Sequence, residues 1–378
     1  MPAEGTGLPP ASDWRAAGRR LQGEAVPQGP TVVSGKGPYG TGGLGRHLAE
    51  VVEALRCRDR LAGCLSAAEL PGKLSGSGST VALAKVSTWA MRLPPARSSA
   101  GRRVLLESRG FDAAAARHLP SGPEHLLAFN GAALQQIAAA RRKGYRSVGL
   151  LSANSHLNNV ARQHGKAWRQ YPIERPWGPR LVARNLAEYE AADRVYVSSQ
   201  YAWDSFVAEG FPTARLVMFP LTPHDRFQPR PAGQSPGTFN VMYVGSLSVN
   251  KGVPLLVDAV RRISHSDLRL VLVGGWSSRG MRRFIETAME ADRRISVQPG
   301  DPLPHLHEAG VYVHPSYEEG YGYAAAEALA CEVPLVVSED SAVKEHAGGS
   351  TPMTVVPTGD LSALVDAIDS AYGRAWVR

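Results

Sequence analysis

The chain has 378 residues, of which 43% are hydrophobic and 20% charged, and a net charge of +8. This composition is typical of a soluble globular protein with room for two domains, and the absence of an apolar run of about 18 residues argues against a transmembrane helix. Three cysteines without metal-type spacing favour a reduced cytosol over a disulfide framework or a zinc site. The positive charge favours anionic partners, but the basic residues are spread widely, which speaks against nucleic acid.

The first half of the chain predicts a tail followed by an α/β domain. Residues 1–29 are rich in Gly and Pro and predict a disordered tail without a secretion signal. From residue 30, short apolar runs alternate with helical patterns, which is typical of a parallel sheet. The expected strands are 30–35, 79–86, 102–108, 125–130, 147–153 and 194–199. The expected helices are 43–56, 131–143, 180–192 and 200–209.

A Pro-rich stretch at 220–236 interrupts this alternation and is interpreted as a linker. The alternation then resumes. The expected strands are 239–246, 268–275, 295–300, 311–316 and 334–339. The expected helices are 252–264, 279–291, 323–331 and 360–372.

These patterns predict an α/β protein with two Rossmann-like, doubly wound parallel-sheet domains, at 30–219 and 237–358. Residues 359–378 are expected to form a C-terminal helix that packs back toward the N-terminal domain. Ligands of such sheets bind outside the carboxyl ends of the strands, so we expect a binding site in a central cleft that both domains face.

The segment "EEGYGYAAAEALA" (318–330) combines a turn, a helix start and two acids. Gly320 and Gly322 allow a close backbone approach, and the helix that follows presents free N–H groups that suit a phosphate. Glu319 precedes the turn and Glu327 lies roughly 6 Å into the helix, so the two acids flank the phosphate position. Carboxylates accept from hydroxyl groups. A nucleotide sugar matches the whole segment, because it has hydroxyl groups at both ends, on the ribose and the hexose, and a diphosphate between them.

This segment resembles the E-x7-E segment of retaining glycosyltransferases of family four (glycosyl transferases group one), which have the GT-B fold. Segments 243–260, 270–275, 311–323 and 332–346 also match that family in order and spacing. The first half matches more loosely, through 40–55 and 185–206.

The resemblance implies that Glu319 contacts hydroxyls of the transferred sugar and that Glu327 binds the donor ribose. Between them, Gly320, Tyr321, Gly322 and Tyr323 are the expected donor-binding turn. The alternative for either acid alone is a solvated loop or helix-surface glutamate, but the complete motif favours the functional interpretation.

Lys251 follows a predicted strand and precedes a helix, with Pro254 suited to its first turn. A lysine there can neutralise the β-phosphate of a departing nucleoside diphosphate. Family members usually have an arginine where this chain has Ser246, so either another basic residue supplies that charge or the diphosphate binds more weakly. The alternative is an ordinary exposed loop lysine.

The Gly-rich stretch "YGTGGLGRHL" (39–48) enters an amphipathic helix and suits a phosphate. The resemblance places this loop at the donor diphosphate, with Gly42 and Gly43 as backbone-binding residues. It is neither G-x-G-x-x-G nor a Walker motif, which argues against nicotinamide cofactors and nucleotide hydrolysis. Gly40 stands where glycogen and starch synthases have a lysine, which argues against a glucan polymerase.

His156 follows the predicted strand 147–153, and many family members have a functional histidine in that loop, touching sugar or acceptor. The alternative is a turn histidine without a role. The basic and aromatic segment 161–180 suits a membrane surface or an anionic, lipid-linked acceptor, and equally a solvated loop over a helix.

The resemblance therefore implies a retaining, metal-independent hexosyl-type glycosyltransferase without a cofactor. It would move a sugar from a UDP- or GDP-sugar to a hydroxyl acceptor, which is a glycan, a lipid-linked molecule or a small molecule. We expect a cytoplasmic protein, with peripheral contact at the inner face of the membrane as a further expectation, and no nucleic-acid partner. The alternatives are an inactive sugar-nucleotide or glycan binder, at which Ser246 and Glu332 hint, and a nucleotide-sugar epimerase.

Overall fold

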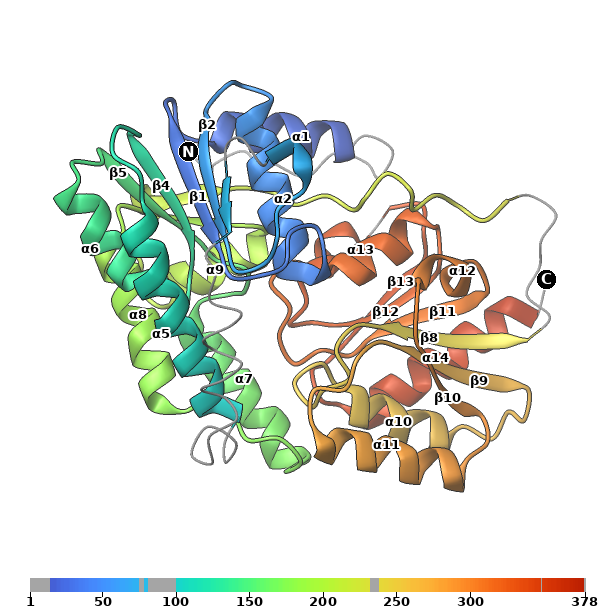
Figure 1. Cartoon of the computed structure of the whole chain (residues 1–378). Helices are drawn as coiled ribbons and strands as arrows, with labels where there is room; N and C mark the ends of the chain where they lie inside the picture. The colour runs from blue at the N-terminus through green and yellow to red at the C-terminus, as the bar shows by residue number, and fades with distance from the viewer. Residues whose placement is uncertain (1–13, 75–77, 81–99, 232–237, 348, 377–378) are drawn as a thin grey trace. The chain divides into compact units, whose positions relative to one another are not determined.

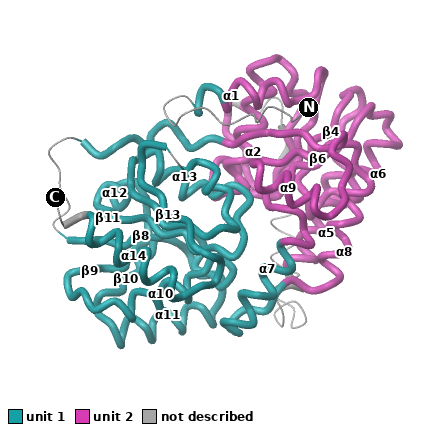
Figure 2. Tube along the Cα trace, turned by 180° about the vertical axis from the view of Figure 1, so that it is seen from behind, with its two compact units in different colours: residues 1–17, 160–176, 222–378 teal, residues 18–159, 177–221 magenta. Residues whose placement is uncertain are grey.

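The computed structural model describes residues 14–74, 78–80, 100–231, 238–347 and 349–376 (Figure 1). The chain divides into two units (Figure 2). The N-terminal unit contains residues 18–159 and 177–221, and the C-terminal unit contains residues 160–176 and 222–378 together with residues 1–17. In the described part of the chain, no helix combines the length and apolar character needed to span a bilayer.

Seven parallel strands form the sheet of the N-terminal unit: β1 (Thr31–Gly35), β2 (Leu61–Ser66), β3 (Gly78–Thr80), β4 (His125–Phe129), β5 (Ser147–Leu151), β6 (Arg194–Val197) and β7 (Leu216–Met218). Their order in the sheet is β3-β2-β1-β4-β5-β6-β7. The strand order therefore reverses between β1 and β4, and this switch point is where doubly wound sheets bind ligands.

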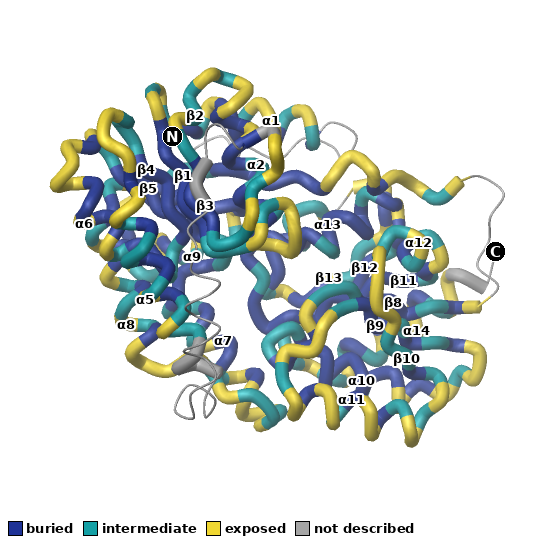
Figure 3. Tube along the Cα trace, viewed as in Figure 1, coloured by how far each residue is buried: buried dark blue, intermediate teal, exposed yellow. Residues whose placement is uncertain are grey.

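Helices cover both faces of this sheet. α2 (Gly42–Arg56) lies on one face, and α5 (Ala100–His118), α6 (Leu134–Arg142) and α8 (Pro179–Ala191) lie side by side on the other (Figure 1). α9 (Gln200–Ala208) is capped by Ser199, whose hydroxyl accepts from the N–H of Ala202 at 3.0 Å. The middle strands are buried from both sides (Figure 3), as parallel strands require.

The C-terminal unit repeats this plan with six parallel strands: β8 (Phe239–Val244), β9 (Leu268–Val273), β10 (Ile295–Gln298), β11 (Ala309–His314), β12 (Leu335–Ser338) and β13 (Met353–Val356). Their order is β10-β9-β8-β11-β12-β13, with the switch point between β8 and β11. α10 (Val253–Arg262), α11 (Arg279–Ala291) and α14 (Leu361–Trp376) cover one face, and α13 (Tyr323–Ala330) lies on the other (Figure 1). α12 (Pro302–His307) precedes β11.

The prediction of a disordered tail over 1–29 is wrong for its second part. Residues Trp14–Ala25 form helix α1. Trp14 is buried and packs edge-on against His346, with 4.6 Å between the ring centroids, and the side-chain amide of Gln22 donates to the carbonyl of Pro220 at 2.8 Å. Tertiary contacts thus stabilise a helix whose glycines give it a low intrinsic helix propensity. Residues 1–13 lie outside the described part of the chain.

The predicted strand 102–108 is also wrong, because this segment belongs to α5. Its buried residues recur with helical spacing at Ser108, Phe111 and Ala115, whereas Leu106 is 57% exposed. A short apolar run does not distinguish a strand from one turn of an amphipathic helix. Of the predicted strand 79–86, residues 81–86 lie outside the described residues.

Two boundary predictions need correction. For the C-terminal helix, which was expected to pack toward the N-terminal domain, the structure shows α14 covering the sheet of its own unit, where Leu364 and Ile368 are fully buried in the core shared with α10. Residues 160–176, predicted to lie in the N-terminal domain, belong to the C-terminal unit. They include most of helix α7 (Leu157–Gln170), and Ala167, Tyr171 and Ile173 pack into the same core.

Candidate functional site

The switch point of the C-terminal sheet brings together a lysine, a glutamate and a histidine. Lys251 Nζ lies 2.8 Å from Glu319 Oε2, and His314 Nε2 lies 3.1 Å from the same oxygen. Lys251 also donates to the carbonyl of Glu318 at 3.4 Å. The side chains of Lys251 and Glu319 are 22% and 16% exposed, so the pair is accessible to a ligand.

A glycine allows this approach. Lys251 follows β8 and Glu319 follows β11, the two neighbouring strands at the switch point. Gly252 caps α10 with φ +71°, and a Cβ at this position would lie 1.9 Å from the carbonyl oxygen of Pro315. Any side chain at Gly252 would therefore push the Lys251 loop away from the end of β11.

His314 was not predicted as a site residue. Its ring is 4% exposed and stacks nearly parallel to Tyr243 and Tyr312, with centroids 6.3 and 6.2 Å away. The Tyr312 hydroxyl lies 3.5 Å from His314 Nδ1, so a proton on Nε2 makes the histidine a donor to Glu319. The tyrosines thus fix the ring that orients the carboxylate.

This arrangement keeps Lys251 and Glu319 charged. Burial alone would raise the pKa of Glu319, but the charge of Lys251 and the hydrogen bond from His314 outweigh it and lower that pKa to about 2. Burial would lower the pKa of Lys251, but the charges of Glu319 and Glu318 raise it above its ordinary value. The site therefore offers a fixed cation beside a fixed anion over the whole physiological pH range.

The lowered pKa predicts a defined pH dependence of stability. Glu319 is ionised in the folded chain down to about pH 2, whereas its ordinary pKa is 4.5. Its contribution to the free energy of unfolding is therefore complete above about pH 4.5 and is lost as the pH falls toward 2. We expect the difference in that free energy between the wild type and Glu319→Gln to stay constant from pH 7 to 5 and to shrink below pH 4.5. A difference that already shrinks between pH 7 and 5 contradicts the lowered pKa.

The turn at 320–323 leads directly into α13. Gly322 caps this helix with φ +83°, and a Cβ there would lie 2.9 Å from the Val343 side chain. Gly322 provides no side-chain cap for the start of α13, and the positive end of a helix dipole attracts anions. Tyr321 and Tyr323 are buried and pack edge to face with their ring centroids 4.8 Å apart.

Glu327 lies in α13 and is 1% exposed. It is one helical turn beyond Tyr323, while Glu319 stands before the turn. Glu319, the turn, the N-terminus of α13 and Glu327 therefore all lie in the C-terminal unit. Ser246, at the end of β8, is exposed, and its carbonyl accepts from the Tyr243 hydroxyl at 2.9 Å.

Segment 160–176 contacts the loop that carries Lys251. The carboxylate of Glu174 accepts from the N–H of Val249 at 2.9 Å, and His164 Nε2 lies 3.2 Å from the side-chain amide of Asn250. Burial, together with the charge of Lys251, lowers the pKa of His164 to about 4. This neutral histidine is a second residue that the sequence analysis did not single out. The predicted membrane or acceptor contact of this segment stays a prediction.

The N-terminal unit has a cavity of about 250 Å³ at its own switch point. Its lining combines the ends of β1, β4 and β5 with parts of α2, α5 and α8, and includes Lys36, Leu44, Ser108, Asn130, Ser155 and Trp177. Lys36 donates to the Ser108 hydroxyl at 3.1 Å, and burial lowers the pKa of this lysine. The cavity thus has an apolar wall, several amide and hydroxyl groups, and one cation.

The other predicted residues of this unit lie near that cavity. Gly42 and Gly43 are exposed at the start of α2, immediately before Leu44 of the lining. The ring of His156 packs against Tyr189 and Phe206 at 5.1 and 4.9 Å, while its neighbours Ser155 and Leu157 line the cavity. The structure gives His156 a packing role, and its catalytic role stays a prediction.

The described residues contain no group of three or more His, Cys, Asp or Glu side chains placed to hold a metal ion. The positive charge near the α13 turn comes from Lys251 and the helix N-terminus.

Residues 238–373 match the family model described as glycosyl transferases group 1. A D-inositol 3-phosphate glycosyltransferase of Pseudarthrobacter chlorophenolicus is 33% identical over 120 residues, which are 29% of this chain and 28% of that protein. The O-antigen chain mannosyltransferase B of Escherichia coli is 28% identical over 115 residues, or 28% of this chain and 30% of that protein. The chain thus spans less than a third of the length of either relative.

Solved structures extend the likeness to almost the whole chain. Sucrose-phosphate synthase from Thermosynechococcus elongatus superposes with a TM-score of 0.68 at 18% identity, covering 92% of this chain and 90% of that one. WaaG, a glycosyltransferase involved in lipopolysaccharide biosynthesis, superposes with a TM-score of 0.66 at 15% identity, covering 91% and 90%. The two switch-point sheets and these matches together show that the chain has the GT-B fold and that its residues 238–373 are similar to the glycosyl transferases group 1.

Proposed function

We propose that this protein is a retaining glycosyltransferase that moves a hexose from a nucleoside diphosphate sugar to a hydroxyl acceptor. The observation that carries the proposal is the hydrogen-bonded group of Lys251, Glu319 and His314 beside the uncapped N-terminus of α13. A cation, a helix N-terminus and acids on either side match the diphosphate, ribose and hexose of such a donor.

The donor diphosphate would lie between Lys251 and the first turn of α13. The lysine ammonium has three donors, of which two bond to Glu319 at 2.8 Å and to the carbonyl of Glu318 at 3.4 Å. The third would bond to the β-phosphate, whose negative charge grows as the sugar leaves. Lys251 and the helix N-terminus supply this positive charge in the proposal, which therefore calls for no metal ion or cofactor.

Glu319 would accept hydrogen bonds from hydroxyls of the transferred hexose, and His314 would hold its carboxylate in place. In the proposed reaction the bond between the sugar C1 and the phosphate oxygen breaks, and the acceptor oxygen bonds to C1 on the same face. The acceptor proton passes to the departing phosphate. The anomeric configuration is kept without Glu319 attacking the sugar.

The acceptor would enter the cavity beside Lys36. Amide and hydroxyl groups of that cavity suit a polyol, and the single cation suits an acceptor with one anionic group. The name of one relative, D-inositol 3-phosphate glycosyltransferase, refers to a phosphorylated polyol and supports this choice. A lipid-linked acceptor, a cytoplasmic location and peripheral contact with a membrane remain part of the proposal.

A panel of UDP-, GDP- and ADP-sugars tests the proposed function. We expect one donor to release its nucleotide when a phosphorylated polyol is present, and NMR of the product to show the donor's anomeric configuration. An inverted product contradicts the retaining mechanism. Donor binding without turnover on any acceptor supports the inactive binder that Ser246 suggests.

Replacing Glu327 by alanine is expected to weaken donor binding. The variant loses two charge-assisted hydrogen bonds to the ribose, each worth about 1.5–3 kcal/mol. The donor Kd should rise at least about tenfold in isothermal titration calorimetry. Glu290→Ala, at an exposed position of α11, removes the same charge and should leave Kd unchanged. A wild-type Kd for a folded Glu327→Ala rules out the ribose contact.

A further inference from the structure

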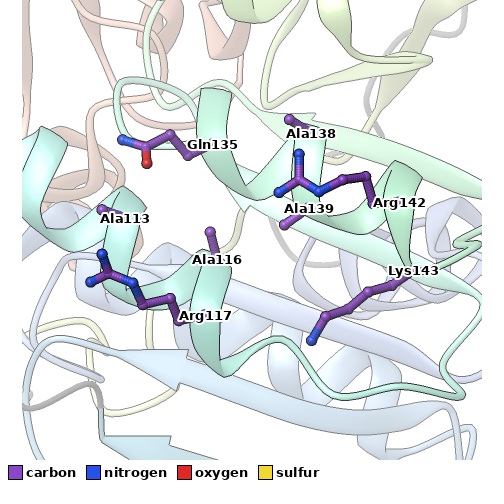
Figure 4. Close-up of a pocket in the computed structure, with 8 residues that line it drawn as sticks. All are labelled: Ala113, Ala116, Arg117, Gln135, Ala138, Ala139, Arg142 and Lys143. Atoms are coloured by element: carbon purple, nitrogen blue, oxygen red, sulfur yellow. The ribbon is translucent and has the colours of Figure 1, made fainter.

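A second cavity of the N-terminal unit lies between α5 and α6 and has a volume of about 470 Å³ (Figure 4). Its floor consists of four alanines: Ala113, Ala116, Ala138 and Ala139. Arg117 of α5, Gln135 and Arg142 of α6, and Lys143 at the C-cap of α6 complete the lining (Figure 4). We call this hollow the α5–α6 groove.

The cationic end of the groove and the proposed acceptor cavity lie at opposite edges of the same sheet. Arg117 lies in the last turn of α5, which leads to β4, and Arg142 lies in the last turn of α6, which leads to β5. The cationic end of the groove is therefore at the amino edge of the sheet. The Lys36 cavity is at the carboxyl edge. A ligand in the groove does not compete with an acceptor.

The three cations of the groove differ from their neighbours in having no acidic partner in its lining. Arg141 pairs with Asp193 at 2.5 Å, and Arg146 pairs with Glu124 at 2.7 Å. None of the eight residues that line the groove is acidic. Lys143 donates to the carbonyl of Leu119, which fixes its ammonium at the rim.

Helix C-termini favour cations, so the ends of α5 and α6 explain part of this charge. They do not explain why three cations line one hollow whose other residues are four alanines and a glutamine. Like charges repel, and a bound anion removes that repulsion. Two guanidinium groups and an ammonium match the oxygens of a phosphate, to which arginine binds in bidentate fashion.

We propose that the α5–α6 groove binds an organic phosphate. The phosphate lies between Arg117, Arg142 and Lys143, and the organic part rests on the alanine floor within reach of the Gln135 amide. This site is independent of the proposed transferase function. Its ligand is either a free phosphate ester or a phospholipid headgroup, which present the same chemistry to the groove.

Alanine-methyl NMR of the full chain tests this proposal with glucose 6-phosphate as the probe. We expect saturable shifts of the methyl groups of Ala113, Ala116, Ala138 and Ala139. The double variant Arg117→Gln/Arg142→Gln should bind the probe at least about tenfold more weakly, because it loses charge-assisted hydrogen bonds. Arg141→Gln/Arg146→Gln removes the same charge from neighbouring, ion-paired positions and should retain the wild-type affinity.

Vesicles of phosphatidylcholine with and without phosphatidylglycerol distinguish the two sources of the phosphate. Sedimentation with the anionic vesicles that is lost in Arg117→Gln/Arg142→Gln but kept in the control pair supports a headgroup site. Saturable methyl shifts without sedimentation support a free ester. The proposal is overturned if the protein shows no methyl shifts and does not sediment with vesicles. It is also overturned if both double variants lose binding equally, because binding would then depend on the net charge of the region and not on the groove.

Discussion

Glu319→Ala is expected to lower turnover by at least about 100-fold while donor affinity falls much less, because the carboxylate acts on the sugar as it leaves and not on the nucleotide. The variant also leaves Lys251 without its 2.8 Å partner and His314 without its acceptor. The freed ammonium can still bind the diphosphate. Steady-state kinetics with the donor found in the nucleotide-sugar panel, beside calorimetric donor binding, separates the two effects.

Glu290→Ala serves as the matched control for this variant, since it removes one exposed carboxylate from the same unit. His314→Ala gives an independent check, because it leaves the carboxylate present but removes the ring that orients it. We expect a smaller fall in turnover for His314→Ala than for Glu319→Ala. Full activity of a folded Glu319→Ala contradicts the role assigned to this residue.

Arg184→Met is expected to destabilise the N-terminal unit by about 3–5 kcal/mol, the usual cost of removing one partner of a buried ion pair. The Arg184 side chain is 10% exposed and donates to the fully buried carboxylate of Asp112. Its Nε also lies 3.9 Å from Glu188, which is fully buried too. The variant leaves two buried carboxylates without their counter-charge.

This network also shapes the proposed acceptor cavity. Glu188 accepts from the N–H groups of Gly131 and Ala133 at 2.6 and 2.9 Å, and so holds the loop that forms one cavity wall. Burial raises the pKa of Glu188 to about 7. The destabilisation by Arg184→Met should therefore be smaller at pH 5, where Glu188 is neutral, than at pH 8.

Urea unfolding, followed by the transition of the N-terminal unit, measures this effect. Arg180→Met removes an exposed arginine of the same helix and should change the free energy of unfolding by less than about 0.5 kcal/mol. Equal effects of the two substitutions, or a destabilisation that grows at pH 5, would show that the buried pair does not stabilise this unit.

The sequence was sufficient to predict the two parallel sheets and the position of Lys251 and Glu319 after strands, but it did not predict the ion pair between them. Both residues follow buried strands, and the carboxyl ends of parallel strands meet at one edge of a sheet. The expected strands that coincide with β1, β4, β8 and β9 are continuous apolar runs of the kind that only a sheet covered on both faces buries.

The remaining features depend on tertiary contacts that local patterns do not encode. His314 looked like one more residue of a buried strand, and only the neighbouring tyrosines turn it toward Glu319. Segment 160–176 looked like an exposed basic and aromatic surface, but Tyr171 bonds Asp258 at 2.8 Å and packs with the C-terminal core. Helix α1 needs the contact between Trp14 and His346. The strands β7 and β13, of three and four residues, are too short to give a clear apolar run, and β2 was not predicted either.

The most direct test is a crystal structure of the chain with the nucleoside diphosphate of its preferred donor. We predict that the β-phosphate lies within hydrogen-bond distance of Lys251 Nζ and the first N–H groups of α13, and that the ribose hydroxyls contact Glu327. A nucleotide bound elsewhere, with the turn at 320–323 empty and Glu327 without a ribose contact, contradicts the proposed donor site.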